Sequence, residues 1–247
     1  MTSRRILRLS GEDTRDFLQG LVTNDIKGLD HGIVYAAILT PQGKFIVDFF
    51  LVPDGDDVLL DVAEDQADML QKRLTMYKLR AKVTIAPSGL NGQRGTGPVP
   101  DGAFVDPRDP AMGWRAYSDA PESDDGTDWD ALRVEHGIPE TGRELTPDTF
   151  ILETGFERLH GVDFRKGCYV GQEVTARMKH KTELRKGLAR VEIIGDATEG
   201  TEITANGKAA GVLHTRSGSR ALAYLRFDRA EGDMTAGDAT VRLDTRL

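Results

Sequence analysis

The feature that most constrains the fold of this chain is a change of sequence pattern at Gly187. Beyond it, short stretches of alternating apolar and polar residues are separated by turn-forming residues. These stretches are Leu188–Ile194, Glu202–Ala205, Gly211–His214, Arg220–Arg226 and Thr240–Leu243. Side chains alternate between the two faces of a strand, so each stretch predicts a half-buried strand. Short strands at regular spacing favour a closed antiparallel sheet, and we predict a small β-barrel domain over residues 187–247.

The longer part of the chain, residues 1–186, mixes helix and strand patterns. Helical spacing of apolar residues predicts helices at Glu12–Val22, Glu64–Leu79, Trp129–His136 and Tyr169–Met178. Strands are predicted at Arg4–Leu9, Gly32–Leu39, Lys44–Val52, Val58–Val62 and Lys82–Ile85, and a turn at residues 40–43 joins two of them into a hairpin. Gly and Pro in Pro87–Pro100 predict a loop, and residues 146–160 receive no element. The fold class is therefore α+β.

Composition restricts the chemistry and the location. The chain has one cysteine, Cys168, which excludes an internal disulfide and fits a reducing compartment. One cysteine also excludes a Cys-ligated iron–sulfur cluster held by this chain alone. The five histidines lack metal-ligand spacing, so no metal site is predicted. No apolar run reaches the roughly 18 residues of a membrane span, and the N-terminus does not resemble a signal peptide. We expect a cytoplasmic protein with no membrane contact.

The segment Lys166–Glu173, with the sequence KGCYVGQE, carries the most distinctive chemistry. Cys168 follows two basic residues and lies near a predicted helix start, and both features favour the thiolate form of a cysteine. Gly167 and Gly171 permit a tight backbone or the close approach of a ligand. A lone cysteine is also often a small buried apolar residue. From the residues alone, Cys168 is therefore either a reactive thiol or part of the core.

This segment, within its wider context 164–177, resembles the YgfZ family of folate-binding proteins in the glycine-cleavage T-protein superfamily. The stretches at 11–25, 39–44 and 132–139 resemble the same family, so the likeness covers nearly the whole chain. The resemblance implies a T-protein-like ring of subdomains with mixed or antiparallel sheets and a small C-terminal β-barrel. It also implies that the protein binds tetrahydrofolate or a related folate. Its expected role is support of iron–sulfur cluster assembly or repair, with Cys168 essential and iron–sulfur proteins or the assembly machinery as partners.

The resemblance also assigns residues to the folate site. Glu135 matches the glutamate that contacts the pterin in the T-protein branch, and a carboxylate can accept two hydrogen bonds from an aminopyrimidine edge. Tyr35 matches an aromatic residue that lines the folate, although a core tyrosine is equally consistent with the sequence. The remaining residues assigned to this site come from the motif and its helix: Lys166, Tyr169, Gln172, Glu173 and Arg177.

One departure argues against aminomethyltransferase chemistry. The aminomethyltransferases carry adjacent aspartates in the second strand of the hairpin, the first being catalytic, and here the pair is Val47-Asp48. Valine cannot bind a proton, and in a regular strand Asp48 points to the opposite face. Two alternatives remain open. One is a tetrahydrofolate-dependent one-carbon transferase. The other is implied by the resemblance, because the family has been linked to tRNA modification: a factor that contacts tRNA weakly through the basic run Arg177–Arg190.

Overall fold

The computed structural model describes residues 3–122, 125–181 and 183–247, although the side chain of Lys181, part of the basic run, lies outside the description. By internal contacts the chain forms two compact units. Unit 1 comprises Met1–Thr127 and Leu159–Gln172, and unit 2 comprises Asp128–Arg158 and Glu173–Leu247. The sequence predicted a folate-binding region over residues 1–186, made of two interleaved α+β subdomains, followed by the barrel domain; the first barrel strand begins at Lys186.

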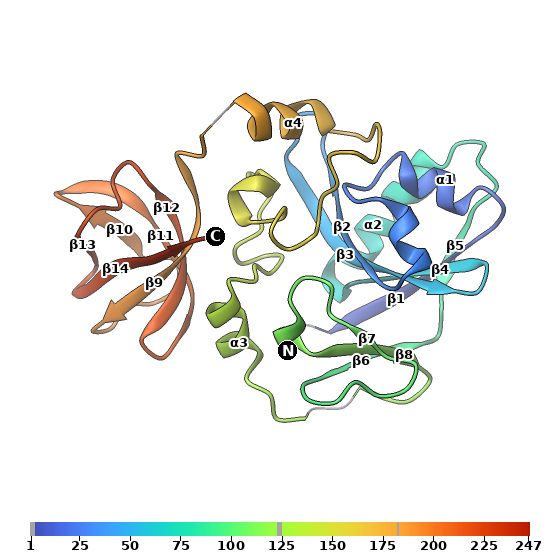
Figure 1. Cartoon of the computed structure of the whole chain (residues 1–247), viewed down its shortest axis with the longest axis horizontal. Helices are drawn as coiled ribbons and strands as arrows, with labels where there is room; N and C mark the ends of the chain where they lie inside the picture. Colours follow the sequence, from blue (N-terminus) through green and yellow to red (C-terminus); the bar gives the residue numbers. More distant parts are fainter. Residues whose placement is uncertain (1–2, 123–124, 182) are drawn as a thin grey trace. The chain divides into compact units, whose positions relative to one another are not determined.

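Unit 1 is built on a five-stranded antiparallel sheet with the strand order β2-β3-β4-β1-β5 (Figure 1). The strands are β1 (Arg4–Ser10), β2 (Val34–Leu39), β3 (Phe45–Asp54), β4 (Asp57–Ala63) and β5 (Thr84–Pro87). One face of the sheet holds the apolar core, against which α2 (Glu64–Tyr77) packs Ala67, Leu70 and Leu74. The shorter helix α1 (Thr14–Gln19) and a 3-10 helix at Ile26–Asp30 pack on the same core.

The opposite face of this sheet borders a second, three-stranded sheet of unit 1, with the order β6-β8-β7. Its strands are β6 (Asn91–Gly95), β7 (Phe104–Val105) and β8 (Trp114–Ser118). The loop predicted over Pro87–Pro100 is therefore wrong, because β6 lies within it. Asn, Gly and Gln are poor strand formers, so the signal was weak. The strand forms through tertiary contacts: a Cβ on Gly95 would lie 2.6 Å from the ring of Trp114, so only glycine admits this ring.

Unit 2 contains a closed six-stranded antiparallel barrel, as the alternating pattern predicted (Figure 1). Around the barrel the order is β10-β11-β12-β9-β14-β13, so β9 pairs with both β12 and β14. The strands are β9 (Lys186–Ile194), β10 (Glu202–Ala205), β11 (Lys208–Ser217), β12 (Arg220–Arg226), β13 (Asp233–Ala236) and β14 (Ala239–Arg246). Among the barrel strands, the sequence missed only β13. Small and branched apolar side chains fill the interior.

The remaining helices differ from their predictions mainly at the ends. Helix α3 (Trp129–His136) has its predicted bounds and ends at Gly137, whose φ is +64°. Helix α4 (Gln172–Lys181) begins three residues later than predicted, after Gly171. A 3-10 helix at Ile151–Thr154 occupies the region that received no element. None of the described helices is long and apolar enough to span a membrane.

Candidate functional site

Cys168 lies in the loop that precedes α4, in unit 1, and it is exposed. Of the two alternatives left open by the sequence, burial in the core is therefore excluded, and the reactivity of the thiol stays a prediction. The flanking residues Lys166 and Tyr169 are both buried. The side chain of Cys168 is thus exposed, whereas those of Lys166 and Tyr169 are buried.

Lys166 anchors the near end of this loop to α1. Its Nζ donates to the carbonyl oxygen of Gln19 at 2.5 Å and to that of Val22 at 2.6 Å. The side-chain amide of Gln19 donates in return to the carbonyl oxygen of Lys166 at 3.0 Å. Burial lowers the pKa of Lys166 to about 8, and the nearby carboxylates of Asp25 and Asp163 oppose this shift. The ammonium group therefore holds the loop from inside the protein.

Gly171 anchors the far end of the loop to the β2–β3 hairpin. Its φ is +86°, and a Cβ there would lie 2.6 Å from the carbonyl oxygen of Thr40 and 2.9 Å from the Cβ of Leu39. Gly167 also has a positive φ, +100°, but a Cβ there would meet nothing within 4 Å. The two glycines thus have different tasks: Gly167 permits the turn into Cys168, and Gly171 additionally allows close packing.

A pocket of about 370 Å³ lies in unit 1, close to the anchored loop. Asn24 shapes its wall by donating to the carbonyl oxygens of Tyr35, at 2.9 Å, and His160, at 2.6 Å. The pocket also contains the carboxylates of Asp25 and Asp163, which act electrostatically on Lys166. Its other lining residues are Lys27, Gly28, His31, Ile33, Val34 and Pro107.

Tyr35 is fully buried, and it is among the residues that line this pocket. The guanidinium carbon of Arg108 lies 5.5 Å from the ring centroid, and the ring of Phe50 packs at 5.3 Å. The hydroxyl donates to Asp48 Oδ2 at 2.8 Å, and burial raises the pKa of Tyr35 well above its usual value. Tyr35 is thus buried, and its predicted contact with folate stays a prediction.

Val47 and Asp48 lie on opposite faces of β3, as the alternation of a regular strand predicts. Val47 is fully buried in the apolar core and pairs with Ile38. Asp48 pairs with Ala37 on the other face and receives the hydrogen bond from Tyr35. Asp48 therefore does not replace the missing acid at position 47.

A buried chain of alternating charges, which sequence reasoning missed, runs between the two sheets of unit 1. Asp61 binds Arg4 at 2.6 Å and Arg115 at 3.2 Å, and Asp106 binds Arg115 at 3.0 Å and Arg108 at 2.8 Å. The guanidinium groups hold the pKa of Asp61 and Asp106 below the usual range. Asp61 and Arg115 are 54 positions apart in sequence, so no local pattern could indicate their contact.

Glu135, the predicted pterin ligand, lies on α3 in unit 2 and is exposed. One carboxylate oxygen is 3.3 Å from Arg190 Nη1, and the other accepts from Arg220. The hydrogen bond from Arg220 is the main reason that the pKa of Glu135 is lowered. Both oxygens therefore already have cationic partners on the barrel.

The other predicted site residues are distributed over both units. Lys166, Cys168, Tyr169 and Gln172 belong to unit 1, and the Nζ of Lys166 lies 5.0 Å from the ring centroid of Tyr169. Glu173 and Arg177 are exposed on α4, in unit 2 with Glu135. Their assignment to a folate site stays a prediction.

The basic run Arg177–Arg190 is partly neutralised within unit 2. Lys179 binds Glu157 at 2.5 Å, and Lys186 lies 3.7 Å from Glu153. Arg190 binds Asp244 at 2.6 Å in addition to Glu135. The structure therefore adds no support to the predicted tRNA contact, which rested on this run alone.

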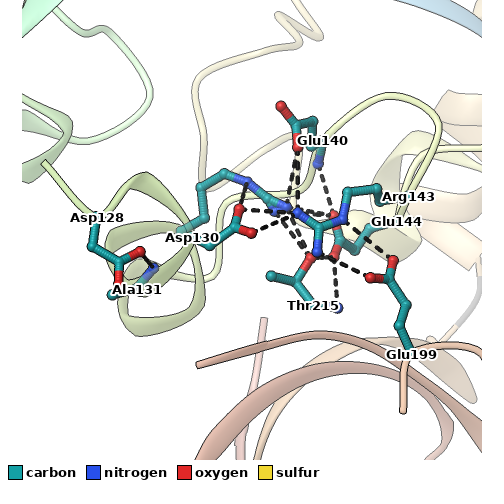
Figure 2. Close-up of polar contacts among 9 residues, drawn as sticks. Asp128, Asp130, Ala131, Glu140, Arg143, Glu144, Glu199 and Thr215 are labelled. Atoms are coloured by element: carbon teal, nitrogen blue, oxygen red, sulfur yellow. Dashed lines mark hydrogen bonds and ion pairs between the residues drawn. The ribbon is translucent and has the colours of Figure 1, made fainter. Parts of the chain in front are cut away.

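A second network missed from the sequence fixes the segment around α3 to the barrel of unit 2 (Figure 2). Arg133 is buried, and its Nη2 donates to Glu144 Oε2 and to Thr215 Oγ1, both at 3.0 Å. Glu144 also accepts from the backbone N–H of Thr215 at 3.2 Å and of Glu140 at 3.0 Å. Figure 2 shows Arg143 beside this network, where it binds Asp130 at 2.9 Å and Glu199 at 3.0 Å.

The chain resembles known iron–sulfur cluster assembly factors in sequence. A family model described as the CAF17 C-terminal beta-barrel domain matches residues 185–246. The mitochondrial iron–sulfur cluster assembly factor IBA57 of Mus musculus is 31% identical over 281 residues, covering 95% of this chain and 78% of the relative. The IBA57 homologue of Mycosarcoma maydis is 32% identical over 216 residues, but the chain spans only 54% of its length.

Among solved structures, the glycine cleavage system aminomethyltransferase T of Bartonella henselae shares the fold. The TM-score is 0.76, with 12% sequence identity, over 100% of this chain and 83% of the enzyme. The T-protein-like fold predicted from the sequence is therefore confirmed. The predicted cytoplasmic location is wrong by these comparisons, because the mouse, human and Mycosarcoma relatives are named as mitochondrial proteins.

Proposed function

This chain belongs to the IBA57 family of iron–sulfur cluster assembly factors, and from that premise we propose that it supports the assembly or repair of iron–sulfur clusters. The exposed thiol of Cys168 is the group that meets the cluster or the protein that carries it. The YgfZ-like motif predicted this role of Cys168, and the relatives named as iron–sulfur cluster assembly factors support the cluster-assembly function.

The observation that carries the proposal is the presentation of Cys168. Lys166 fixes the loop on one side and Gly171 fixes it on the other, so the exposed thiol has a defined position. Iron–sulfur clusters are held by several cysteine thiolates. A single cysteine supplies one ligand, and the remaining ligands come from a partner. This arrangement suits transient contact with a cluster during transfer rather than its storage.

The test is rescue of iron–sulfur enzyme activity in cells that lack this protein. Wild type and Cys168→Ser are compared at equal abundance, with the exposed change Glu183→Gln as a control. We expect rescue by wild type and the control but not by Cys168→Ser, whose circular dichroism spectrum is unchanged. Full rescue by the serine variant would remove Cys168 from the proposal, and failure of wild type would remove the function.

We also propose that the protein binds tetrahydrofolate. The YgfZ-like sequence supports this ligand, and the T-protein-like fold is compatible with it. Of the residues predicted for the pterin, Glu135 is exposed, although its oxygens also pair with Arg190 and Arg220. Tyr35 fits less well as a stacking platform, because it is fully buried and its ring has Arg108 and Phe50 as neighbours. No aminomethyl transfer is proposed, since the position of the catalytic acid is the buried Val47.

Titration calorimetry with tetrahydrofolate tests this second proposal on wild type and Glu135→Gln. Hydrogen bonds to a charged group contribute about 1.5–3 kcal/mol, so we expect a loss of about tenfold or more in affinity. Asp244→Asn is the matched control, because it removes another acidic partner of Arg190 without touching Glu135. Equal affinity in all three proteins would exclude Glu135, and no binding by wild type would exclude folate.

A further inference from the structure

The C-terminal end of α2 presents two large apolar side chains to solvent. Met76 is 65% exposed and Leu79 is 86% exposed. The core-facing residues of this helix are Leu70 and Leu74, and helical spacing places Met76 on the opposite side. Single exposed apolar residues are common on proteins, so exposure alone would carry little weight.

Leu79 is also in a strained backbone conformation. Helix α2 ends at Tyr77, Lys78 caps it, and Leu79 follows with a φ of +44°. This position after a helix is most often glycine, because other residues are strained in the left-handed region. A glycine would relieve the strain and remove the exposed apolar side chain together. The folded chain by itself therefore gives no reason for a leucine here, and strained residues of this kind cluster at functional sites.

Positive charge surrounds the two apolar side chains. Between positions 72 and 82 the sequence has five basic residues and no acidic one, in a chain with a net charge of −8. Three of the bases have intramolecular contacts: Arg73 with Tyr77, Lys78 with the carbonyl of Val83, and Lys82 with Glu12. Within the part of the chain that the structure describes, Lys72 and Arg80 make no ion pair.

We propose that the α2 patch, formed by Lys72, Met76, Leu79 and Arg80, docks an acidic protein whose surface offers an apolar pocket to Leu79. The argument is charge complementarity around an apolar anchor, the usual arrangement of a buried hot spot with a polar rim. A membrane surface fits less well, since interfacial helices use a broad apolar face, and here that face is buried in the core. RNA fits less well because single-stranded RNA readers stack bases on aromatic rings, and the patch contains none. This proposal goes beyond the cluster-assembly role, which concerns Cys168.

The experiment uses the full chain in its own host cells with a photo-crosslinking amino acid in place of the exposed Thr75. In a second variant of the chain, the crosslinking amino acid replaces Ile194, which is 61% exposed on the barrel, as the control position. The protein crosslinked at position 75 but not at 194 is purified, and its affinity is measured with wild type and two variants, Leu79→Gly and Lys72→Glu/Arg80→Glu. We expect an acidic partner, at least tenfold weaker binding by each variant, and weaker binding by wild type at higher salt.

Leu79→Gly should fold as wild type does, because glycine readily adopts the positive φ at this position, and its melting temperature should be equal or higher. Weaker binding by this variant therefore cannot be attributed to unfolding. Wild type and this variant are also tested for sedimentation with vesicles containing phosphatidylserine and for retention of bulk tRNA. Equal yields of crosslinked protein at positions 75 and 194 would overturn the proposal. So would an affinity for the partner that Leu79→Gly leaves unchanged. Binding of vesicles or tRNA by wild type that Leu79→Gly abolishes would also overturn it.

Discussion

Lys166 and Gln19 hold each other through reciprocal hydrogen bonds. The Lys166 ammonium donates to the Gln19 carbonyl at 2.5 Å, and the Gln19 amide donates to the Lys166 carbonyl at 3.0 Å. The two residues are 147 positions apart, so this clamp joins α1 to the cysteine loop. The loop that presents Cys168 is therefore a fixed part of unit 1.

The clamp predicts a pH-dependent stability. The pKa of Lys166 is about 8 in the folded chain, against an ordinary value of 10.5. Between these values the unfolded chain binds more protons, so the free energy of unfolding rises with pH across this window. Below pH 8 the cost of burying the charge is present in full. Lys166→Met should lack this rise, whereas the exposed change Arg165→Met should keep it. Urea unfolding at pH 7.5 and 9.5 measures the difference, and parallel behaviour of wild type and Lys166→Met would contradict the shift.

The two glycines of the loop should differ in their response to alanine. Both have positive φ, so each substitution strains the backbone by about 1–2 kcal/mol. Only Gly171→Ala also forces a Cβ against the carbonyl oxygen of Thr40. We expect Gly171→Ala to reduce the free energy of unfolding by more than Gly167→Ala. An equal loss, measured by chemical denaturation, would mean that the close packing on the hairpin contributes nothing.

The buried pair in unit 2 should be far more important for stability than the exposed one beside it. Arg133→Ala leaves the Glu144 carboxylate buried with only backbone donors and Thr215, and breaking such a pair costs about 3–5 kcal/mol. Arg143→Ala removes partly exposed ion pairs, which contribute about 0–1 kcal/mol each. Thermal unfolding of the two variants distinguishes them. A similar small loss of stability in both variants would show that the buried Glu144 carboxylate does not need Arg133 as a partner.

Restoring an acid at position 47 should not create an aminomethyltransferase. Val47→Asp would bury a charge in the apolar core, at a cost of about 3 kcal/mol or more. Asp48→Asn, on the polar face, should cost about 1 kcal/mol, because Tyr35 can still donate to the amide oxygen. Denaturation midpoints and an assay of tetrahydrofolate-dependent aminomethyl transfer check both changes. Transfer activity in a stable Val47→Asp protein would overturn the interpretation of this strand.

Features with a local pattern were predictable from the sequence. Most barrel strands follow from alternation over a few residues, and the β2–β3 hairpin follows from two apolar runs joined by turn residues. Helix α3 follows from its spacing and its terminal glycine. Strand β6 was missed because its residues have little strand propensity, and its formation depends on contact with Trp114.

In the candidate site, too, residues in a local motif were predictable and their distant partners were not. The motif identified Cys168, and the structure places it at the surface. The partners that define its surroundings were not predictable, because Gln19 and Thr40 are remote in sequence from the loop. The same limit applies to Arg115, whose acidic partners lie on different segments, and to the two arginines that engage Glu135.

The division of unit 2 into two chain segments sets an order of events during synthesis. Residues Asp128–Arg158 are synthesised before the barrel strands. Arg133 and Glu144 therefore cannot form their hydrogen bonds with Thr215 until β11 has been synthesised. The barrel itself cannot close until β14 is made, because β9 pairs with it. Unit 1 is also made of two segments, but it is complete earlier, since its last segment ends at Gln172. As domains fold during synthesis from the N-terminus, the cysteine loop can be anchored while the barrel is still unformed.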